Sequence, residues 1–376
     1  MDESTAAQWL HLLNTPGLGP VRTRALLDHY SDINEVFQEQ RFPEQLNIPT
    51  AAAHNLRQAT KDQIKQELDW LQKPSNHLLT WHDPLYPPQL RLIADPPMVL
   101  FVKGDLNSLL LPQLAVVGSR NATRSGLNNA KAFSAELSRK GMVITSGLAA
   151  GIDAAAHQGA LDSGGLTIAV MGTGINTIYP KGNQSLAKTI IQQGAVVSEL
   201  PFNMPPHAGN FPRRNRIIAG LSLGTLVVEA ARKSGTAITA RLSMECNRPV
   251  MAIPGSIHNP MARGCHQLIR QGASLVESAQ DILEELQPHI HMLSDQLSNH
   301  LKEIDQQSIE KPAPEPHMEL SDTQQLIFQQ IDYHPVSFDD IVKHTELSSA
   351  VIASDLLIME LSGLIEKLPG ATYQRT

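Results

Sequence analysis

The middle of the chain alternates short apolar segments with stretches of helical period. The apolar segments are almost continuously hydrophobic, as is typical of parallel strands covered on both faces. They are Leu114–Gly118, Met142–Ser146, Thr167–Gly172, Ala195–Leu200, Leu226–Ala230 and Val250–Pro254. Helical patterns of roughly ten to fifteen residues separate most of them, as in βαβ units. The pattern therefore predicts an α/β fold with a doubly wound, mostly parallel sheet.

The residues before this region predict short helices. Thr15–Pro20 contains a Pro-Gly-x-Gly turn, and the amphipathic stretch Val21–Tyr30 follows it. This arrangement resembles a helix-hairpin-helix or SAM-like module, in which backbone amides can meet DNA phosphates. A tight turn between packed helices explains the same residues, and the sequence leaves both interpretations open. A proline-rich connector, Trp81–Pro97, then leads into an expected edge strand at Met98–Lys103.

The residues after the alternating region predict a linker and a small C-terminal domain. Gln287–Glu319 is polar and contains Lys311-Pro312-Ala313-Pro314-Glu315-Pro316, which is typical of a flexible, partly extended linker. Leu320–Thr376 shows three short helical patterns and a hairpin near Leu368-Pro369-Gly370, which suits the wing of a winged helix. The sequence thus predicts four parts: a helical module at 1–75, the sheet domain at 76–286, a linker at 287–319 and a winged-helix domain at 320–376.

Composition narrows the class of protein. The chain has 376 residues, 41% of them hydrophobic, and no apolar run approaches the ~20 residues that span a bilayer. Met1–Ser4 lacks the basic and apolar regions of a signal peptide. Two cysteines, Cys246 and Cys265, imply neither a disulfide scaffold nor a four-ligand zinc site. We expect a cytoplasmic protein with no membrane segment.

The net charge of −7 conceals an uneven distribution. Residues 115–286 carry 16 Lys and Arg against 10 Asp and Glu, a balance of +6. The remaining residues carry 14 against 27, a balance of −13. A locally basic domain in an acidic chain indicates a binder of polyanions.

The most informative segment is Phe211–Leu221, which begins Phe-Pro-Arg-Arg-Asn-Arg. Cations crowded in this way are costly unless something anionic lies among them. Arginine and asparagine also supply the hydrogen-bond donors that phosphates and base edges accept. A solvated helix start beside a buried apolar face is the alternative, and the surrounding loops favour a phosphate site.

Small and polar residues follow several of the predicted strands. Gly118-Ser119-Arg120, Thr145-Ser146-Gly147 and Gly172-Thr173-Gly174 each come at a strand end, where ligands bind in parallel sheets. Glycine lets the backbone approach a ligand, and amides at a helix start attract anions. Ser234-Gly235-Thr236 begins a further helix after Lys233, although an ordinary helix cap by Ser234 or Thr236 would look the same. These loops together predict a phosphate-binding rim.

Enzymatic signatures are weak. The chain has no complete G-x-G-x-x-G after its first strand and no Walker A motif, which argues against NAD binding and motor activity. Asp153 and His157 share a helix face, as a metal pair or as an ordinary polar contact. Glu229 follows a strand, either as a general acid or base or as a structural carboxylate paired with an arginine. We expect no catalytic residue, no metal and no cofactor.

With these loops in place, the chain resembles the DprA/Smf family of bacterial DNA-processing proteins. The match is strong over about Trp81 to Leu286, and its blocks keep the family's order and spacing. The blocks are Val117-Gly118-Ser119-Arg120, Ser146–Asp153, Tyr179-Pro180, Phe211–Leu221, Ser234-Gly235-Thr236 and Pro254-Gly255. The flanking parts are similar to the SAM-like and winged-helix additions of longer members.

The resemblance implies an extended Rossmann-like domain that binds single-stranded DNA without catalysis. It implies protection of incoming DNA in natural transformation, loading of the RecA recombinase and assembly as a homodimer. The expected DNA-binding residues supply cations, amides, hydroxyls and one aromatic ring for stacking. They are Gly118, Ser119, Arg120, Ser146, Gly147, Phe211, Arg213, Arg214, Asn215, Arg216, Lys233, Ser234, Gly235 and Thr236. One arginine of the cluster is an alternative anchor for the loop, through Asp153 or Glu229.

Three further hypotheses stay open. Leu320–Thr376 carries three cations and eight acids, a balance of −5, which indicates a protein-contact or regulatory module rather than a reader of duplex DNA. Gly224–Glu229 is similar to the Gly-Thr and Glu elements of Rossmann-like nucleotide phosphoribohydrolases, without their preceding Pro-Gly-Gly and with one extra residue before Glu229. A scaffold with a vestigial pocket would bind no DNA.

Overall fold

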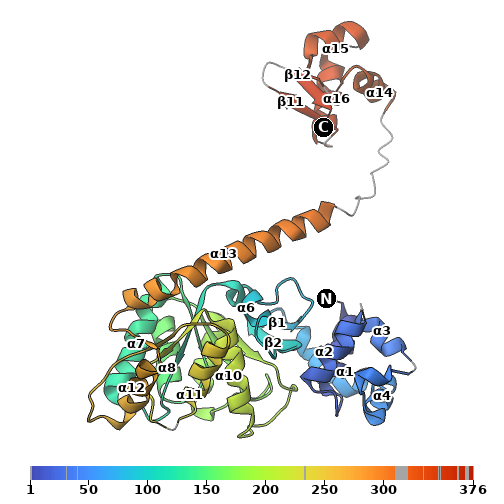
Figure 1. Cartoon of the computed structure of the whole chain (residues 1–376). Helices are drawn as coiled ribbons and strands as arrows, with labels where there is room; N and C mark the ends of the chain where they lie inside the picture. Colours follow the sequence, from blue (N-terminus) through green and yellow to red (C-terminus); the bar gives the residue numbers. More distant parts are fainter. Residues whose placement is uncertain are drawn as a thin grey trace. The chain divides into compact units, whose positions relative to one another are not determined.

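The computed structural model describes residues 2–30, 32–39, 41–232, 234–309, 321–332, 334–345, 347, 349–361, 364–368 and 372–375. The chain divides into two compact units, residues 1–301 and residues 302–376 (Figure 1). The first unit contains the large sheet, and the second contains a small sheet of its own.

A nine-stranded sheet forms the centre of the first unit. Its order is β1-β2-β6-β5-β4-β3-β7-β8-β9. Every neighbouring pair in the part of the sheet from β6 through β3 to β9 is parallel. At the other side, β2 pairs antiparallel with β6, and β1 pairs antiparallel with β2. The strands are β1 (Asn76–Thr80), β2 (Val99–Gly104), β3 (Gln113–Val117), β4 (Val143–Ser146), β5 (Thr167–Val170), β6 (Gly194–Ser198), β7 (Gly224–Val227), β8 (Val250–Ala252) and β9 (Ser274–Leu275). The predicted α/β fold with a mostly parallel sheet is confirmed.

Helices cover both faces of this sheet because its strands are apolar on both sides. In β3, Leu114 and Val116 pack with the helices of one face, and Ala115 and Val117 pack with those of the other. The first face is covered by α7 (Arg124–Arg139), α8 (Ile152–Asp162) and the start of α13 (Ala279–Ile309). The second face is covered by α6 (Pro88–Arg91), α10 (Asn210–Leu221), α11 (Thr236–Glu245) and α12 (Arg263–Arg270).

The N-terminal helices form a cluster beside β1 and β2 (Figure 1). They share a core with α9 (Gln184–Gln192), in which Trp70 contacts Phe101 and Phe202 edge-on. The helices are α1 (Glu3–Asn14), α2 (Pro20–His29), α3 (Ile33–Gln38), α4 (Thr50–Arg57) and α5 (Lys65–Leu71). The prediction of short helices is confirmed, and the Pro-Gly-x-Gly segment is the turn between α1 and α2, with Gly17 at φ +88°.

The strand order reverses at β3, and this reversal places the candidate site. The chain builds β3, β4, β5 and β6 outward in one direction, then returns to β7 on the other side of β3. The loops after β3 and β7 therefore leave the same edge of the sheet and diverge over opposite faces. Open parallel sheets bind ligands in the crevice that such a switch creates.

The prediction that Met98–Lys103 forms an edge strand was wrong. These residues form β2, but β1 lies outside β2 and is the actual edge. The sequence did not indicate β1, because Asn76 and His77 make its start polar. The connector before β2 also contains the short helix α6.

The prediction of a linker at 287–319 was also wrong over residues 287–309. Residues 287–309 continue α13, with Pro288 inside the helix, instead of forming a partly extended chain. Ile290, Leu293 and Leu297 extend the apolar face of α13 against the sheet domain. The Pro-rich segment 311–316 lies outside the described residues.

The second unit has the helices and hairpin expected of a winged helix. Strands β11 (Ile365–Leu368) and β12 (Thr372–Arg375) pair antiparallel, and β10 (Val336–Ser337) pairs with β12. Helices α14 (Asp322–Gln329), α15 (Phe338–Thr345) and α16 (Ser349–Leu361) pack on this sheet around Ile341 and Ile352. The tip of the hairpin, Pro369 and Gly370, lies outside the described residues.

Candidate nucleic-acid interface

A cleft of about 790 Å³ opens at the strand-order reversal. Its walls come from the loop after β3, the segment leading into α11 and the first turns of α10. Gly118, Arg120, Phe211, Arg214 and Thr236 are among the residues that line it. Loops widely separated in the sequence thus converge because their strands end at one edge of the sheet.

Close backbone packing shapes the floor of the cleft near β3. The Ile152 amide donates to the Ser119 carbonyl at 3.2 Å, so α8 begins directly beside the β3 loop. A Cβ added at Gly118 would lie 2.5 Å from Ile152 Cγ1. Gly151 precedes the helix at φ +82°, a conformation that favours glycine. These two glycines therefore fix the approach of the α8 N-terminus to the cleft.

The start of α11 carries unused hydrogen-bonding capacity. Its N-cap residue is Gly235, which offers no side-chain cap. Capping by Ser234 or Thr236, the ordinary alternative in the sequence, is therefore not what the structure shows. Ser234 Oγ is buried and has no hydrogen-bond partner among the described residues. Ser234, Gly235 and Thr236 line the cleft, and the amides of such a helix start suit an anion such as phosphate.

The three arginines at the start of α10 point in different directions. Arg213 and Arg216 are three residues apart and share a helix face, where both contact Glu199. Arg216 Nη2 lies 2.5 Å from Glu199 Oε2, and its Nε lies 3.0 Å from Asp95 Oδ2. Arg213 is half exposed, with Nε 3.7 Å from Glu199 Oε1. Arg216 therefore anchors α10 to the connector before β2, and neither it nor Arg213 lines the cleft.

Arg214 is turned toward the sheet and the cleft. Its Nη1 donates to the Gly147 carbonyl at 2.8 Å and to the Val170 carbonyl, which follow β4 and end β5. Burial lowers the pKa of Arg214 to about 10, while Asp153 opposes that effect. The guanidinium is thus still charged at neutral pH. It ties two strand ends to α10 and places a positive charge at the cleft floor.

An aromatic and cationic stack forms one wall of the cleft. The Arg120 guanidinium carbon lies 5.8 Å from the centre of the Phe211 ring. The Tyr179 ring lies on Phe211 with centroids 5.6 Å apart and planes inclined by 41°. Phe211 also covers Gly172, where an added Cβ would lie 2.6 Å from Phe211 Cδ1. Tyr179 is 44% exposed, so the outer end of the stack faces solvent.

Arg120 is the exposed cation of this wall. Its charge contributes to the lowered pKa of Arg214, so two positive groups lie close together in the cleft. Within the described part of the chain, no carboxylate forms an ion pair with Arg120. Neighbouring cations without a counter-charge attract an anion.

Asp153 and His157 make separate structural contacts. Asp153 Oδ2 accepts hydrogen bonds from the Gly147 and Ala149 amides at 3.1 and 3.3 Å. His157 Nδ1 lies 2.6 Å from Thr167 Oγ1, whose hydroxyl donates to a backbone carbonyl, so Nδ1 must carry the proton. Each side chain therefore has a structural polar contact of its own, with partners outside the helix face that the two residues share. In the described ranges, no group of three or more His, Cys, Asp and Glu side chains is placed to hold a metal.

His157 makes stability dependent on pH. Burial, with a smaller contribution from Arg214, lowers the pKa of His157 to about 3 from 6.5. Between these values the unfolded chain binds the extra proton, so the free energy of unfolding falls as pH drops below 6.5. The expected slope is about 1.4 kcal/mol per pH unit. His157→Gln keeps an N–H donor and should flatten the profile measured by urea unfolding from pH 7 to 4.5; parallel profiles would contradict this.

Glu229 has a structural role but a different partner from the one expected. Its carboxylate accepts from the Thr123 amide at 2.9 Å and from the Thr123 hydroxyl at 2.6 Å. Asn259 Nδ2 lies 3.4 Å from the same group. Glu229 therefore holds the start of α7 to the end of β7, and the expectation of an arginine partner was wrong.

The structure brings together most of the residues expected at the interface. Nine of them line the cleft: Gly118, Ser119, Arg120, Phe211, Arg214, Asn215, Ser234, Gly235 and Thr236. Ser146 is buried below it, with its hydroxyl bonded to the Val116 carbonyl, and Gly147 supports Asp153 and Arg214. Lys233 lies outside the described residues. Tyr179 was missed as a site residue, although the Tyr-Pro pair belonged to the matching pattern.

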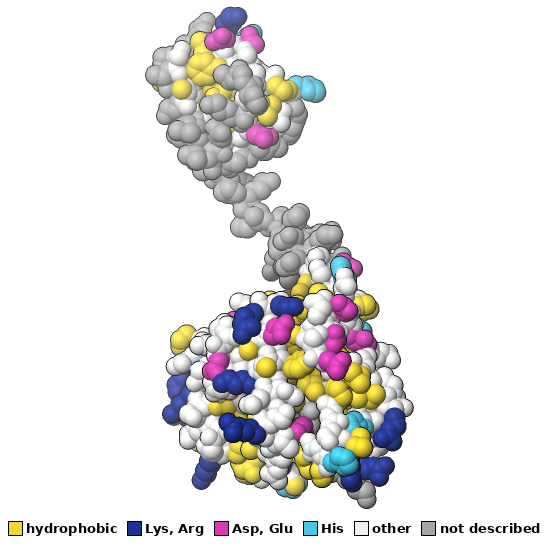
Figure 2. Space-filling model, turned by 90° about the vertical axis from the view of Figure 1, so that its left-hand side faces the viewer, with side chains coloured by type: hydrophobic (Ala, Val, Ile, Leu, Met, Phe, Trp, Pro, Cys, Tyr) yellow, Lys and Arg dark blue, Asp and Glu magenta, His cyan; other side chains and the backbone are white. Residues whose placement is uncertain are grey.

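The cations on one face of the first unit are scattered. On the face in Figure 2, Lys and Arg side chains of the first unit are spread as separate patches. Arg120, Phe211 and the α11 start are grouped locally at the cleft. No helix in the described ranges is both long and apolar enough to cross a membrane.

Comparison with known proteins places the chain in a family. The family of DNA recombination-mediator protein A matches residues 77–287, and the DprA winged helix domain matches residues 311–371. Protein Smf of Escherichia coli K12 is 42% identical over 366 residues, covering 96% of this chain and 94% of that protein. DNA processing protein DprA of Streptococcus pneumoniae is 47% identical over 205 residues, covering 54% of this chain and 72% of that protein.

Solved structures agree with this assignment. The crystal structure of DprA from Streptococcus pneumoniae has a TM-score of 0.66 and 37% identity, covering 74% of this chain and 97% of that one. A structure of DprA from Helicobacter pylori, described for its single-stranded DNA binding mode, has a TM-score of 0.51 and 28% identity, covering 57% and 97%. Fold, sequence and domain composition agree, and the chain belongs to the DprA/Smf family of DNA-processing proteins.

Proposed function

We propose that this protein binds single-stranded DNA in the cleft and processes it for recombination. The observation that carries the proposal is the exposed Arg120–Phe211–Tyr179 stack beside the uncapped start of α11. The stack offers a flat aromatic face for a base, and the helix start offers amides for a phosphate. The Helicobacter pylori relative, described as binding single-stranded DNA, supports the same ligand.

The geometry favours a single strand over a duplex. Stacking on Tyr179 or Phe211 needs a base whose flat face is free, and bases in a duplex are already stacked on their neighbours. Base stacking on aromatic side chains also tolerates any sequence, because every base has such a face. We therefore expect sequence-independent binding whose affinity depends on salt through the phosphate contacts.

We propose that binding proceeds without catalysis. The Gly-Thr pair that resembles the phosphoribohydrolases, Gly224-Thr225, lies buried in β7. Glu229, the carboxylate of that resemblance, accepts hydrogen bonds from Thr123 and is not among the described residues that line the cleft. Release of free base from nucleoside monophosphates would overturn this part of the proposal.

The family membership supports further roles in the same process. We propose that the protein acts in the cytoplasm, protects incoming strands during natural transformation, helps to load the RecA recombinase and assembles as a homodimer. RecA filament nucleation with and without the protein tests loading, and analytical ultracentrifugation tests assembly. We further propose that the acidic C-terminal winged helix contacts protein rather than DNA; strong duplex binding by residues 302–376 would contradict that role.

Arg120→Gln should weaken single-strand binding and leave the fold intact, because the side chain is exposed and forms no ion pair with the described residues. Loss of one phosphate contact should reduce the slope of log K against log salt by about 0.7. Fluorescence anisotropy with labelled oligo-dT across a salt series measures both quantities. Arg139→Gln, an exposed arginine of α7, is the matched control. An unchanged slope for Arg120→Gln would remove this residue from the interface.

A further inference from the structure

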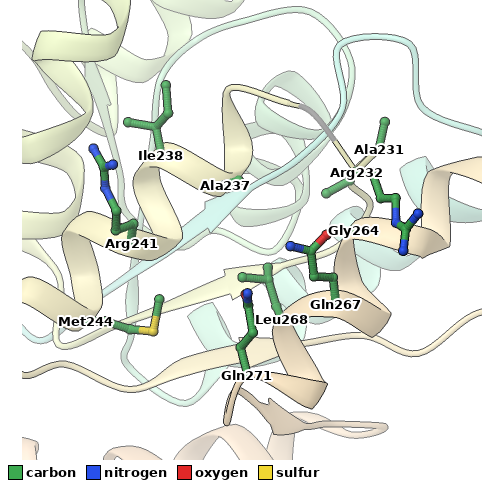
Figure 3. Close-up of a pocket in the computed structure, with 11 residues that line it drawn as sticks. Ala231, Arg232, Ala237, Ile238, Arg241, Met244, Gly264, Gln267, Leu268 and Gln271 are labelled. Carbon is green, nitrogen blue, oxygen red and sulfur yellow. The ribbon is translucent and has the colours of Figure 1, made fainter.

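A pocket of about 300 Å³ lies at the end of the sheet opposite the cleft. Its residues come just before β7 and β8, whereas the cleft residues follow the ends of β3 and β7. The end of α6, the residues after α11 and the middle of α13 complete its walls. It shares no lining residue with the cleft or with the hollow between α11 and α12 in Figure 3. We call it the α6–α13 pocket.

Arg248 is a buried cation of this pocket. Its Nη1 donates to the carbonyls of Ala219 and Gly220, at 2.6 Å each, and to that of Ser222. Its Nη2 donates to the Gln89 carbonyl at 2.7 Å. Burial lowers the pKa of Arg248 to about 10, so the guanidinium is still charged at neutral pH.

The contacts of Arg248 cap the C-terminus of α10, which is an ordinary structural role for an arginine. A helix C-terminus carries roughly half a negative charge, so the cap leaves part of the guanidinium charge uncompensated. In the described ranges, no carboxylate forms an ion pair with Arg248. Its Nε and one hydrogen of Nη2 have no acceptor among the same residues. The cap therefore leaves both charge and donors for an anion.

Gln89 supplies a second donor without a partner. Its side chain lines the pocket and is 6% exposed. The Nε2 atom is buried and has no hydrogen-bond partner among the described residues. A buried donor without an acceptor is costly, so it indicates an acceptor that the protein alone does not supply. Because the Gln89 carbonyl accepts from Arg248, the amide and the guanidinium belong to neighbouring groups.

The mouth of the pocket is apolar. Leu92 and Met292 line it and are 68% and 57% exposed, and Leu223 and Leu293 add buried apolar surface. None of the described residues that line the pocket is acidic. A buried cation behind an apolar mouth suits an anion that carries an apolar group. Its volume is at the lower limit of the ~300–1,000 Å³ of ligand pockets, so the pocket admits a small molecule.

We propose that the α6–α13 pocket binds a small organic acid, whose carboxylate is held by Arg248 and Gln89 and whose short apolar chain lies against Leu92 and Met292. A carboxylate matches the planar donors of a guanidinium, and it would give the Gln89 amide its missing acceptor. The apolar chain would cover side chains that are otherwise exposed. This site goes beyond the binding of DNA, because it shares no residue with the cleft.

The test uses hexanoate as the probe and NMR of the full chain with labelled methionine and histidine side chains. The Met292 methyl signal should shift saturably, while Met171, in the core beside the N-terminal helices, should not respond. Each buried methylene strengthens binding about fourfold, so hexanoate should bind at least about tenfold more tightly than acetate. Equal affinity for the two acids, or tighter binding of inorganic phosphate, would overturn the inference.

His289 supplies a second readout, since it also lines the pocket. Burial lowers its pKa and Arg248 lowers it further, whereas Glu285 opposes both. Cys246 is the remaining titratable group in the lining. A bound carboxylate should raise the His289 pKa, because it adds a negative charge beside the ring. Neutral hexanamide should leave that pKa unchanged, and an unchanged pKa at saturating hexanoate would overturn the inference.

Gln89→Leu tests the second donor and leaves Arg248 in place as the cap of α10. The variant should bind hexanoate about tenfold more weakly, because one hydrogen bond to a charged group is lost. It should unfold at the native urea concentration or above, since an unpartnered buried amide is removed. Gln192→Leu, at an exposed position of α9, is the matched control and should bind hexanoate as the native chain does. Native hexanoate affinity in Gln89→Leu, or equal losses in the two variants, would overturn the inference.

Discussion

Replacing Arg216 by methionine should lower the free energy of unfolding by about 3–5 kcal/mol, the cost of breaking a buried ion pair from one side. Glu199 is almost fully buried and would lose the Arg216 guanidinium, whose Nη2 lies 2.5 Å from Glu199 Oε2. Asp95 would also lose its contact with Arg216, and this contact ties α10 to the connector before β2. Urea unfolding monitored by circular dichroism measures the change.

The double variant Arg216→Met, Glu199→Gln is the matched control. It removes the uncompensated carboxylate, so it should recover a large part of the lost stability. If Arg216→Met unfolds at the native midpoint and its DNA affinity falls steeply, the residue contacts DNA and its assignment as an anchor is wrong.

Replacing Phe211 by alanine should cost about 1–3 kcal/mol of single-strand affinity for each base that stacks on this wall, a factor of ~5–150. Arg120 and Tyr179 both contact the ring, so its removal takes away a contact of each. Anisotropy with oligo-dT measures the loss.

Two controls separate stacking from packing. Phe211→Leu keeps apolar volume over Gly172 but has no flat face, so it should bind nearly as weakly as the alanine variant. Gly172→Ala leaves Phe211 in the sequence but places a Cβ 2.6 Å from its ring, which must shift. It should lose affinity as well. Native affinity in Phe211→Leu would show that the wall does not stack bases.

The sheet could be predicted because parallel strands are apolar on both faces. The six predicted runs correspond to β3–β8, whose burial is almost complete. Strand β1 was missed because its start is polar, and β9 has two residues, too few for any pattern. Helix α13 was misread because the polar composition of 287–319 and the prolines of 311–316 suggested a linker. Its apolar positions nevertheless follow a helical period through Ile282, Leu286, Ile290, Leu293 and Leu297.

The location of the site could be predicted, but the role of each arginine could not. Loops after parallel strands converge by geometry, and the sequence showed which loops held glycine and cations. The separation of Arg213 and Arg216 from Arg214 follows from the 3.6-residue helical repeat, but their partners come from distant segments. Glu199 and Asp95 gave no sign in the sequence that they receive Arg216. Tyr179 was missed because its loop precedes α9, far from the arginine cluster in the chain.

The most direct test of the central claim compares the native chain's affinity for labelled oligo-dT and for a duplex of equal length across a salt series. We predict tighter binding of the single strand, with an affinity that falls steadily as salt rises. Equal or tighter binding of the duplex, or no single-strand binding at low salt, would contradict the assignment of the cleft.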